Sequence, residues 1–166
     1  MATDTKAGVT TQVYEVYIKA TPQTIWEAIT SPEWTQKYGY KGRADYDLRP
    51  GGAYRAHATP DMIKFGLPEV VVDGEVVEAT PPRRLVQTYR FLFQPANEAE
   101  GFTRVIWEIE PTASGFSRLT VTHELEGAPI MAAMVASKFS EQGAGGWAWI
   151  LSDLKSLIET GKTMGE

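Results

Sequence analysis

The chain is 166 residues long, the length of one domain. Hydrophobic residues make up 43% of it and charged residues 22%, which excludes a disordered tail, a collagen and a coiled coil. Lys and Arg total 16 against 21 for Asp and Glu. An acidic chain without a long basic run is not expected to bind nucleic acid.

The sequence contains no cysteine, which excludes disulfides, zinc–cysteine clusters and thiol chemistry. Its two histidines, His57 and His123, are far apart and fall short of a metal-ligand set, so no metal or cofactor is expected. The first residues have no apolar core, and no stretch approaches the roughly 18 apolar residues of a membrane span. We therefore expect a cytoplasmic protein, with a flexible N-terminus over residues 1–9 and one domain over residues 10–162.

The N-terminal part of that domain predicts one strand and two short helices. Residues 12–20 alternate between apolar and polar side chains, which is typical of a half-buried strand. The Thr-Pro pair at 21–22 is a helix start signal, and the Ser-Pro pair at 31–32 repeats it. Trp34 and Tyr38, four residues apart, predict the apolar side of the second helix.

Six further strands are predicted at close intervals. Short turns between them favour antiparallel hairpins, because short turns cannot join parallel strands. Gly74 lies inside one strand and indicates a bulge or bend. The strands are expected at residues 41–48, 53–58, 69–79, 84–93, 103–110 and 116–125.

Residues 137–160 predict one long helix, with apolar side chains from Trp147 to Ile158 at helical spacing. Such a helix is long enough to cross a sheet and to cover its apolar face. The expected fold class is therefore α+β. A curved antiparallel sheet of about seven strands wraps around the C-terminal helix, and two short helices follow the first strand.

This order of elements resembles the START-like helix-grip superfamily, and the local motifs resemble its branch of activator of Hsp90 ATPase homologue 1-like proteins. The matching segments are residues 20–34, 47–54, 74–89, 118–125 and 145–158. The resemblance implies an apolar cavity between the sheet and the long helix that binds lipids, polyketides or other hydrophobic molecules. Two features depart from the family pattern: Tyr38 replaces a tryptophan, and residues 126–142 form a longer connection that suggests a lid.

Small residues support a cavity independently of the resemblance. Ala56 and Ala58 lie on the inward face of their strand, and residues 143–146 place glycines in the first turns of the long helix. Glycine in a helix is unfavourable by roughly 1 kcal/mol relative to alanine, so something should offset it. Space for a ligand would do so, and a tight helix–sheet crossing would do so equally.

Large side chains around these small ones would line a pocket of a few hundred Å³. Met131 and Met134 belong to the expected lid, although a helix docked on the core would explain them as well. The predicted ligand-binding residues are Trp26, Trp34, Tyr38, Tyr54, Ala56, Ala58, Tyr89, Phe91, Trp107, His123, Met131, Met134, Gly143, Gly146 and Trp147.

Binding of a hydrophobic small molecule is the function that this pattern favours. A cyclase- or hydrolase-type enzyme is the alternative, with His123 and either Tyr54 or Tyr89 as acid and base. A histidine in such a position is more often a core residue bonded to a backbone carbonyl or a tyrosine. A co-chaperone-like interaction is a third hypothesis, suggested by the family name alone. Trp149 points away from the apolar stripe, where we favour packing over a homodimer contact.

Overall fold

The computed structural model describes residues 11–136 and 145–166. Their seven strands form one antiparallel sheet with the order β1-β7-β6-β5-β4-β3-β2. Strands β2 to β7 follow one another as a meander, and β1 pairs with β7 at one edge. The predicted α+β class is therefore confirmed. The strands are β1 (Thr11–Ile18), β2 (Ala44–Tyr46), β3 (Ala53–His57), β4 (Val70–Thr80), β5 (Arg84–Phe91), β6 (Thr103–Pro111) and β7 (Ser117–Glu124).

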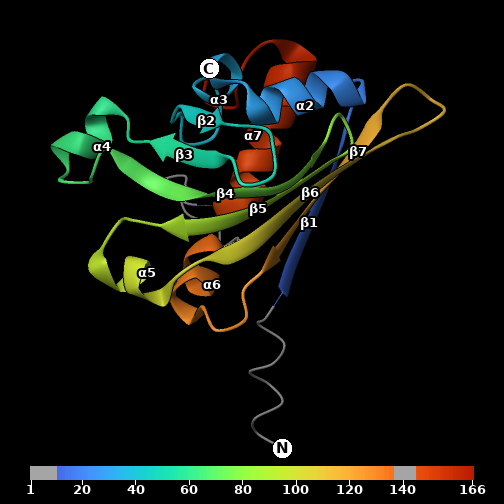
Figure 1. The fold of residues 1–166 in the computed structure, drawn as a ribbon. Coiled ribbons are helices and arrows are strands. Elements are labelled where there is room, and N and C mark those ends of the chain that lie inside the picture. Colours follow the sequence, from blue (N-terminus) through green and yellow to red (C-terminus); the bar gives the residue numbers. More distant parts are fainter. Residues whose placement is uncertain (1–10, 137–144) are drawn as a thin grey trace, which may run out of the picture.

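One helix crosses a face of this sheet and the shorter helices gather at its ends (Figure 1). The crossing helix is α7 (Gly146–Thr160), α2 (Pro22–Thr30) and α3 (Pro32–Thr35) lie at one end, and α5 (Pro95–Glu100) and α6 (Pro129–Val135) lie together at the other. A further helix, α4 (Pro60–Lys64), follows β3. None of the helices in the described part of the chain is long and apolar enough to span a bilayer.

The alternating strands place their apolar sides against α7. On β1, Ile18 is fully buried while Tyr17 beside it is exposed. The Thr21 side chain caps α2 by accepting a hydrogen bond from the Thr24 backbone N–H at 3.2 Å. The core consists of the inward residues of β3 to β7, the buried stripe of α2, the buried side of α6 and the sheet-facing side of α7. The sequence therefore predicts the faces of these elements correctly, except at Asp153 of α7, a polar residue that the structure buries.

Two elements are shorter than expected. The helix expected to contain both Trp34 and Tyr38 is α3, which ends at Thr35. Tyr38 lies beyond it, and its hydroxyl donates to the Ala28 carbonyl oxygen at 2.8 Å. The strand expected over residues 41–48 is limited to the three residues of β2. The chain between α3 and β2 is thus a loop, and residues 38–42 of it line the cavity described below.

The prediction of one helix from residue 137 is wrong at its start. The helix α7 begins at Gly146 after Gly145, and residues 137–144 lie outside the described part. Gly146 has a φ of +61°, and a Cβ there would lie 2.4 Å from the Val135 carbonyl oxygen. The close approach of α6 therefore requires this glycine.

The bulge expected at Gly74 is displaced along the strand. The β4–β5 register shifts between Val76 and Glu78, where the extra residue lies. Gly74 has a different role, because a Cβ there would meet the Thr88 carbonyl oxygen at 1.9 Å. Its lack of a side chain lets β5 pass directly against β4.

Candidate functional site

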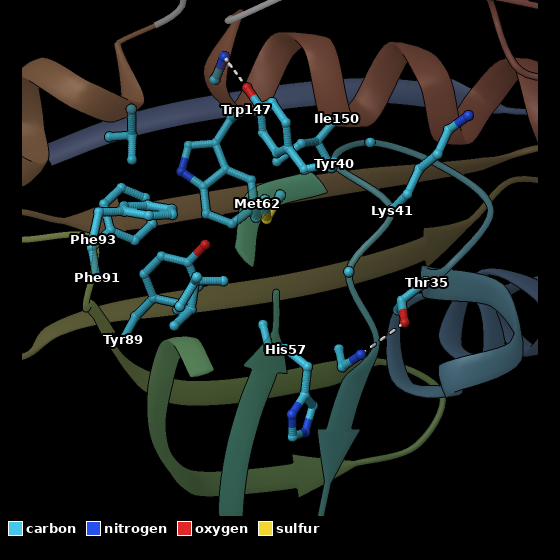
Figure 2. A pocket seen from close by; sticks show the side chains of 18 of the residues that line it. Thr35, Tyr40, Lys41, His57, Met62, Tyr89, Phe91, Phe93, Trp147 and Ile150 are labelled. Atoms are coloured by element: carbon cyan, nitrogen blue, oxygen red, sulfur yellow. Dashed lines mark hydrogen bonds between the residues drawn. The ribbon is translucent and has the colours of Figure 1, made fainter. Parts of the chain in front are cut away.

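A cavity of about 380 Å³ lies between the sheet, α7 and the loop that follows α3 (Figure 2). Its walls are mostly aromatic and aliphatic. The lining residues are Thr35, Tyr38, Gly39, Tyr40, Lys41, Gly42, Ala44, Tyr54, Ala56, His57, Met62, Val71, Val72, Tyr89, Phe91, Phe93, Met134, Val135, Gly146, Trp147 and Ile150.

The sheet wall of the cavity is built from inward residues of β3, β4 and β5. The Tyr54 and Tyr89 rings stack with 6.0 Å between centroids and 14° between planes. Phe91 extends this row, with its centroid 5.6 Å from that of Tyr89. Burial raises the pKa of Tyr54 and of Tyr89 well above the usual value near 10, so both phenols stay protonated.

The helix wall is fixed by a buried histidine behind it. The Trp147 indole N–H donates to His123 Nδ1 at 3.1 Å, and His123 Nε2 lies 2.6 Å from Thr103 Oγ1. His123 is 0% exposed, and burial lowers its pKa to about 4. It is outside the lining, so it orients Trp147 rather than facing the cavity. This is the core role that the sequence left open, with a threonine and a tryptophan as partners.

The loop over residues 38–42 closes a third side of the cavity and is fastened to α7. The Gly39 backbone N–H donates to Asp153 Oδ2 at 2.8 Å, and the other oxygen of this buried carboxylate accepts from the Met164 N–H at 2.8 Å. The Tyr40 hydroxyl accepts from the Gly146 N–H at 3.2 Å. These contacts set the loop conformation, which no local sequence pattern indicates.

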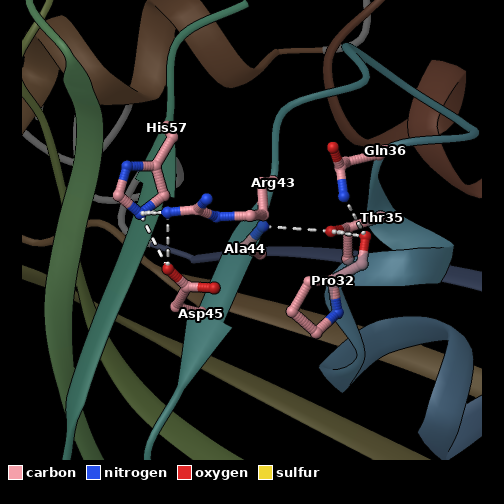
Figure 3. A network of polar contacts seen from close by, with 7 residues as sticks. All are labelled: Pro32, Thr35, Gln36, Arg43, Ala44, Asp45 and His57. Carbon is pink, nitrogen blue, oxygen red and sulfur yellow. Dashed lines mark hydrogen bonds and ion pairs between the residues drawn. The ribbon is translucent and has the colours of Figure 1, made fainter.

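Polar contacts at the sheet edge tie α3 to β2 and β3 (Figure 3). The Ala44 N–H donates to Thr35 Oγ1 at 3.0 Å. Asp45 Oδ2 lies 2.9 Å from His57 Nε2 and 3.1 Å from Arg43 Nη2. The His57 ring points away from the other lining side chains in Figure 2, as the strand alternation predicts. Among the described residues, no cluster of histidines and carboxylates could hold a metal ion.

The helix α6 covers the remaining end and is held by α5. Glu100 accepts hydrogen bonds from the Ile130 N–H at 2.8 Å and the Met131 N–H at 2.9 Å, which satisfies two unpaired donors of the first turn. Met131 is 2% exposed and packs into the core, whereas Met134 is 40% exposed and reaches the cavity. Met131 thus fits the alternative of a helix docked on the core, and Met134 fits the alternative of a cover over the cavity.

We expect Glu100→Ala to destabilise the protein by about 1–2 kcal/mol, because the α6 N-terminus would lose both charge-assisted hydrogen bonds. Urea unfolding at pH 7 measures the change. Glu98→Ala is the matched control, since Glu98 is an exposed acid on the same helix α5. Equal stability of the two variants would contradict the role assigned to Glu100.

The structure brings together only part of the predicted ligand-binding set. Those in the lining are Tyr38, Tyr54, Ala56, Tyr89, Phe91, Met134, Gly146 and Trp147. Those elsewhere in the described chain are Trp26, Trp34, Ala58, Trp107, His123 and Met131. Gly143 lies outside the described residues. The sequence missed several lining residues, among them the loop over residues 39–42, Met62 of α4 and Ile150 of α7. Ile150 carried a usable signal in its place in the helical stripe, and α4 carried one in the Thr-Pro pair at its start.

The comparison with protein-family models identifies this architecture. The model described as "Activator of Hsp90 ATPase homolog 1-like protein" matches residues 19–159. The chain belongs to this family. The match extends from the end of β1 almost to the end of α7 and so includes every element that lines the cavity. The search of the curated proteins found no match.

Solved structures similar to this family member share its fold at low identity. The Aha1 dimer from Colwellia psychrerythraea has a TM-score of 0.65 and 18% identity, covering 92% of this chain and 98% of that chain. CalU16 from Micromonospora echinospora has a TM-score of 0.62 and 17% identity, covering 93% and 78%. DynU16, a protein in the dynemicin biosynthetic locus, has a TM-score of 0.66 and 24% identity, covering 93% of this chain and 49% of that chain.

Proposed function

We propose that this protein binds a hydrophobic small molecule in the cavity between the sheet and α7. The observation that carries the proposal is an apolar space of about 380 Å³. Protein interiors are close-packed and leave few voids larger than a water molecule. A space of this size falls in the range of small-molecule sites, and its aromatic walls favour an apolar occupant.

The charges around the cavity limit what can enter it. In the described part of the chain, Lys41 and His57 are the ionisable groups of the lining apart from the protonated tyrosines. An ion buried in the apolar part would lose its hydration without a counter-charge, which is strongly unfavourable. A lipid, a polyketide or an aromatic metabolite fits these walls. DynU16, with the same fold, lies in a biosynthetic locus, which supports a metabolite as the ligand.

Two alanines two residues apart, one in β3 and one just after its end, test this proposal. Ala56→Leu would fill part of the cavity and weaken binding of the fluorescent probe N-phenyl-1-naphthylamine by about tenfold or more, because overpacking is costly. Ala58→Leu is the matched control, since Ala58 is absent from the lining, and its affinity should stay within about twofold of wild type. Fluorescence titration measures both. Failure of the wild type to bind, or equal binding by wild type and Ala56→Leu, would overturn the proposal.

The enzyme alternative depended on His123 as an acid or base at the cavity. His123 is fully buried outside the lining and already uses both ring nitrogens, so we favour binding over catalysis.

The Colwellia relative is a dimer. A homodimer of this chain stays an untested hypothesis, and packing stays the favoured interpretation of Trp149.

A further inference from the structure

The Tyr89 hydroxyl differs from the other phenols around the cavity. Figure 2 shows it pointing from β5 toward Trp147 and Met62. The residue is only 9% exposed, yet across residues 11–136 and 145–166 its hydroxyl has no hydrogen-bond partner. Three neighbouring phenols form hydrogen bonds within the protein: Tyr38 with Ala28, Tyr40 with Gly146 and Tyr46 with Gln87. The Tyr54 ring lies against that of Tyr46, with 4.6 Å between centroids.

The Tyr89 ring is held in place on several sides. It stacks on the Tyr54 ring. Its centroid lies 5.4 Å from that of the His123 ring and 5.8 Å from that of the Trp147 ring. The backbone of the same residue is fixed by Thr103, whose hydroxyl donates to the Tyr89 carbonyl oxygen at 3.0 Å. The hydroxyl therefore has a set position at the cavity wall. Burial keeps it protonated, so it can donate a hydrogen bond.

A hydroxyl that faces an apolar cavity without a protein partner is unfavourable unless a ligand or water supplies one, and native proteins satisfy almost all such groups. A ligand that places an oxygen acceptor near Tyr89 would supply the missing bond. A carboxylate is a poor candidate at this position. Among the residues that the structure describes, Lys41 is the only lysine or arginine in the lining, it is an exposed residue of the loop, and burying an anion without a cation is costly.

We propose that the ligand is a neutral aromatic compound with a carbonyl oxygen, and that the Tyr89 hydroxyl donates a hydrogen bond to this oxygen. The aromatic body is inferred from the rings of Phe91, Phe93 and Trp147, which flank Tyr89 and favour stacked or edge-to-face contact with another ring. This inference rests on the proposed function, since it names the chemistry that the same cavity selects.

Two probes that differ only at the carbonyl test the inference. They are 2-acetylnaphthalene and 2-ethylnaphthalene, and each is measured by displacement of N-phenyl-1-naphthylamine. We expect Tyr89→Phe to weaken binding of 2-acetylnaphthalene by about fivefold to tenfold, because one hydrogen bond is lost while the ring remains. Binding of 2-ethylnaphthalene should change by less than about twofold, since it never makes that bond. Tyr17→Phe, the same change at an exposed tyrosine outside the cavity, is the matched control.

The outcomes separate the two proposals. If 2-ethylnaphthalene binds the wild type and Tyr89→Phe weakens neither probe, or weakens both equally, carbonyl recognition by Tyr89 is wrong while the cavity still binds apolar molecules. If the wild type binds N-phenyl-1-naphthylamine and neither naphthalene displaces it, the inference is wrong while the cavity still binds an apolar molecule. If the wild type does not bind N-phenyl-1-naphthylamine, the proposed function fails together with the inference. If Tyr89→Phe weakens binding of 2-acetylnaphthalene but not of 2-ethylnaphthalene, and Tyr17→Phe weakens neither, the proposed function and the inference are both supported.

Discussion

Replacing Gly74 by alanine is expected to destabilise the protein by about 4 kcal/mol or more, a large part of the total stability of a domain. A Cβ at this position would lie 1.9 Å from the Thr88 carbonyl oxygen and 2.6 Å from its carbonyl carbon. Both atoms belong to the backbone of β5, so no side-chain rotation can relieve the clash. The strands β4 and β5 must separate, and these two strands carry part of the cavity wall.

The measurement is the midpoint of urea unfolding, followed by circular dichroism. Gly165→Ala is the matched control, because a Cβ there meets nothing within 4 Å and the residue has no positive φ. We expect the control to stay within about 0.5 kcal/mol of wild type. A Gly74→Ala variant as stable as Gly165→Ala would show that β4 and β5 do not approach each other as closely as the structure has them.

The sheet was predictable because its strands alternate strongly. On β6, Val105, Trp107 and Ile109 all face the core and the residues between them are more exposed, as the period of two requires. The short helices α4 and α5 were missed because five or six residues are too few for a helical period to show. The start of α4 did carry a signal, because Thr59 caps the helix before Pro60. The same Thr-Pro pair predicted the start of α2.

The cavity was only partly predictable, because alternation identifies the face of a strand and not the position along the sheet. Tyr89 and Trp107 both point inward, but Trp107 does not reach the cavity. Its indole N–H donates to the buried Gln87 side chain at 3.0 Å, in the filled part of the core. The loop over residues 39–42 takes its shape from Asp153 on α7, more than a hundred residues away in the sequence.

Acidification is expected to unfold the protein partly through His123. Its Nδ1 accepts the Trp147 N–H, so the ring proton is on Nε2. Thr103 donates its hydroxyl hydrogen to the Tyr89 carbonyl oxygen and can therefore accept from Nε2. Both partners select the neutral ring. A second proton, on Nδ1, would face the Trp147 N–H and break that hydrogen bond.

The sign of the effect follows from the two states of the chain. The pKa of His123 is about 4 in the folded protein and near 6.5 when the chain is unfolded, so the unfolded state binds the proton more readily. This contribution to stability is fully present above pH 6.5, declines as the pH falls and is lost below pH 4. At about 1.4 kcal/mol for each pH unit, the loss amounts to about 3 kcal/mol.

Urea unfolding of the wild type and of His123→Gln between pH 7 and pH 4.5 isolates the contribution of His123 titration to the unfolding free energy. Carboxylates titrate in both proteins over this range, so only the difference in unfolding free energy between them reports on His123. Glutamine cannot titrate but loses part of the hydrogen bonding, so the variant should be less stable at pH 7. The difference in unfolding free energy should narrow toward pH 4.5, because only in the wild type does protonation of this histidine in the unfolded chain lower the unfolding free energy. A difference in unfolding free energy that stays constant with pH would mean that His123 is not held neutral between Thr103 and Trp147. The role assigned to His123, which is to orient Trp147 in the helix wall of the cavity, would then be wrong.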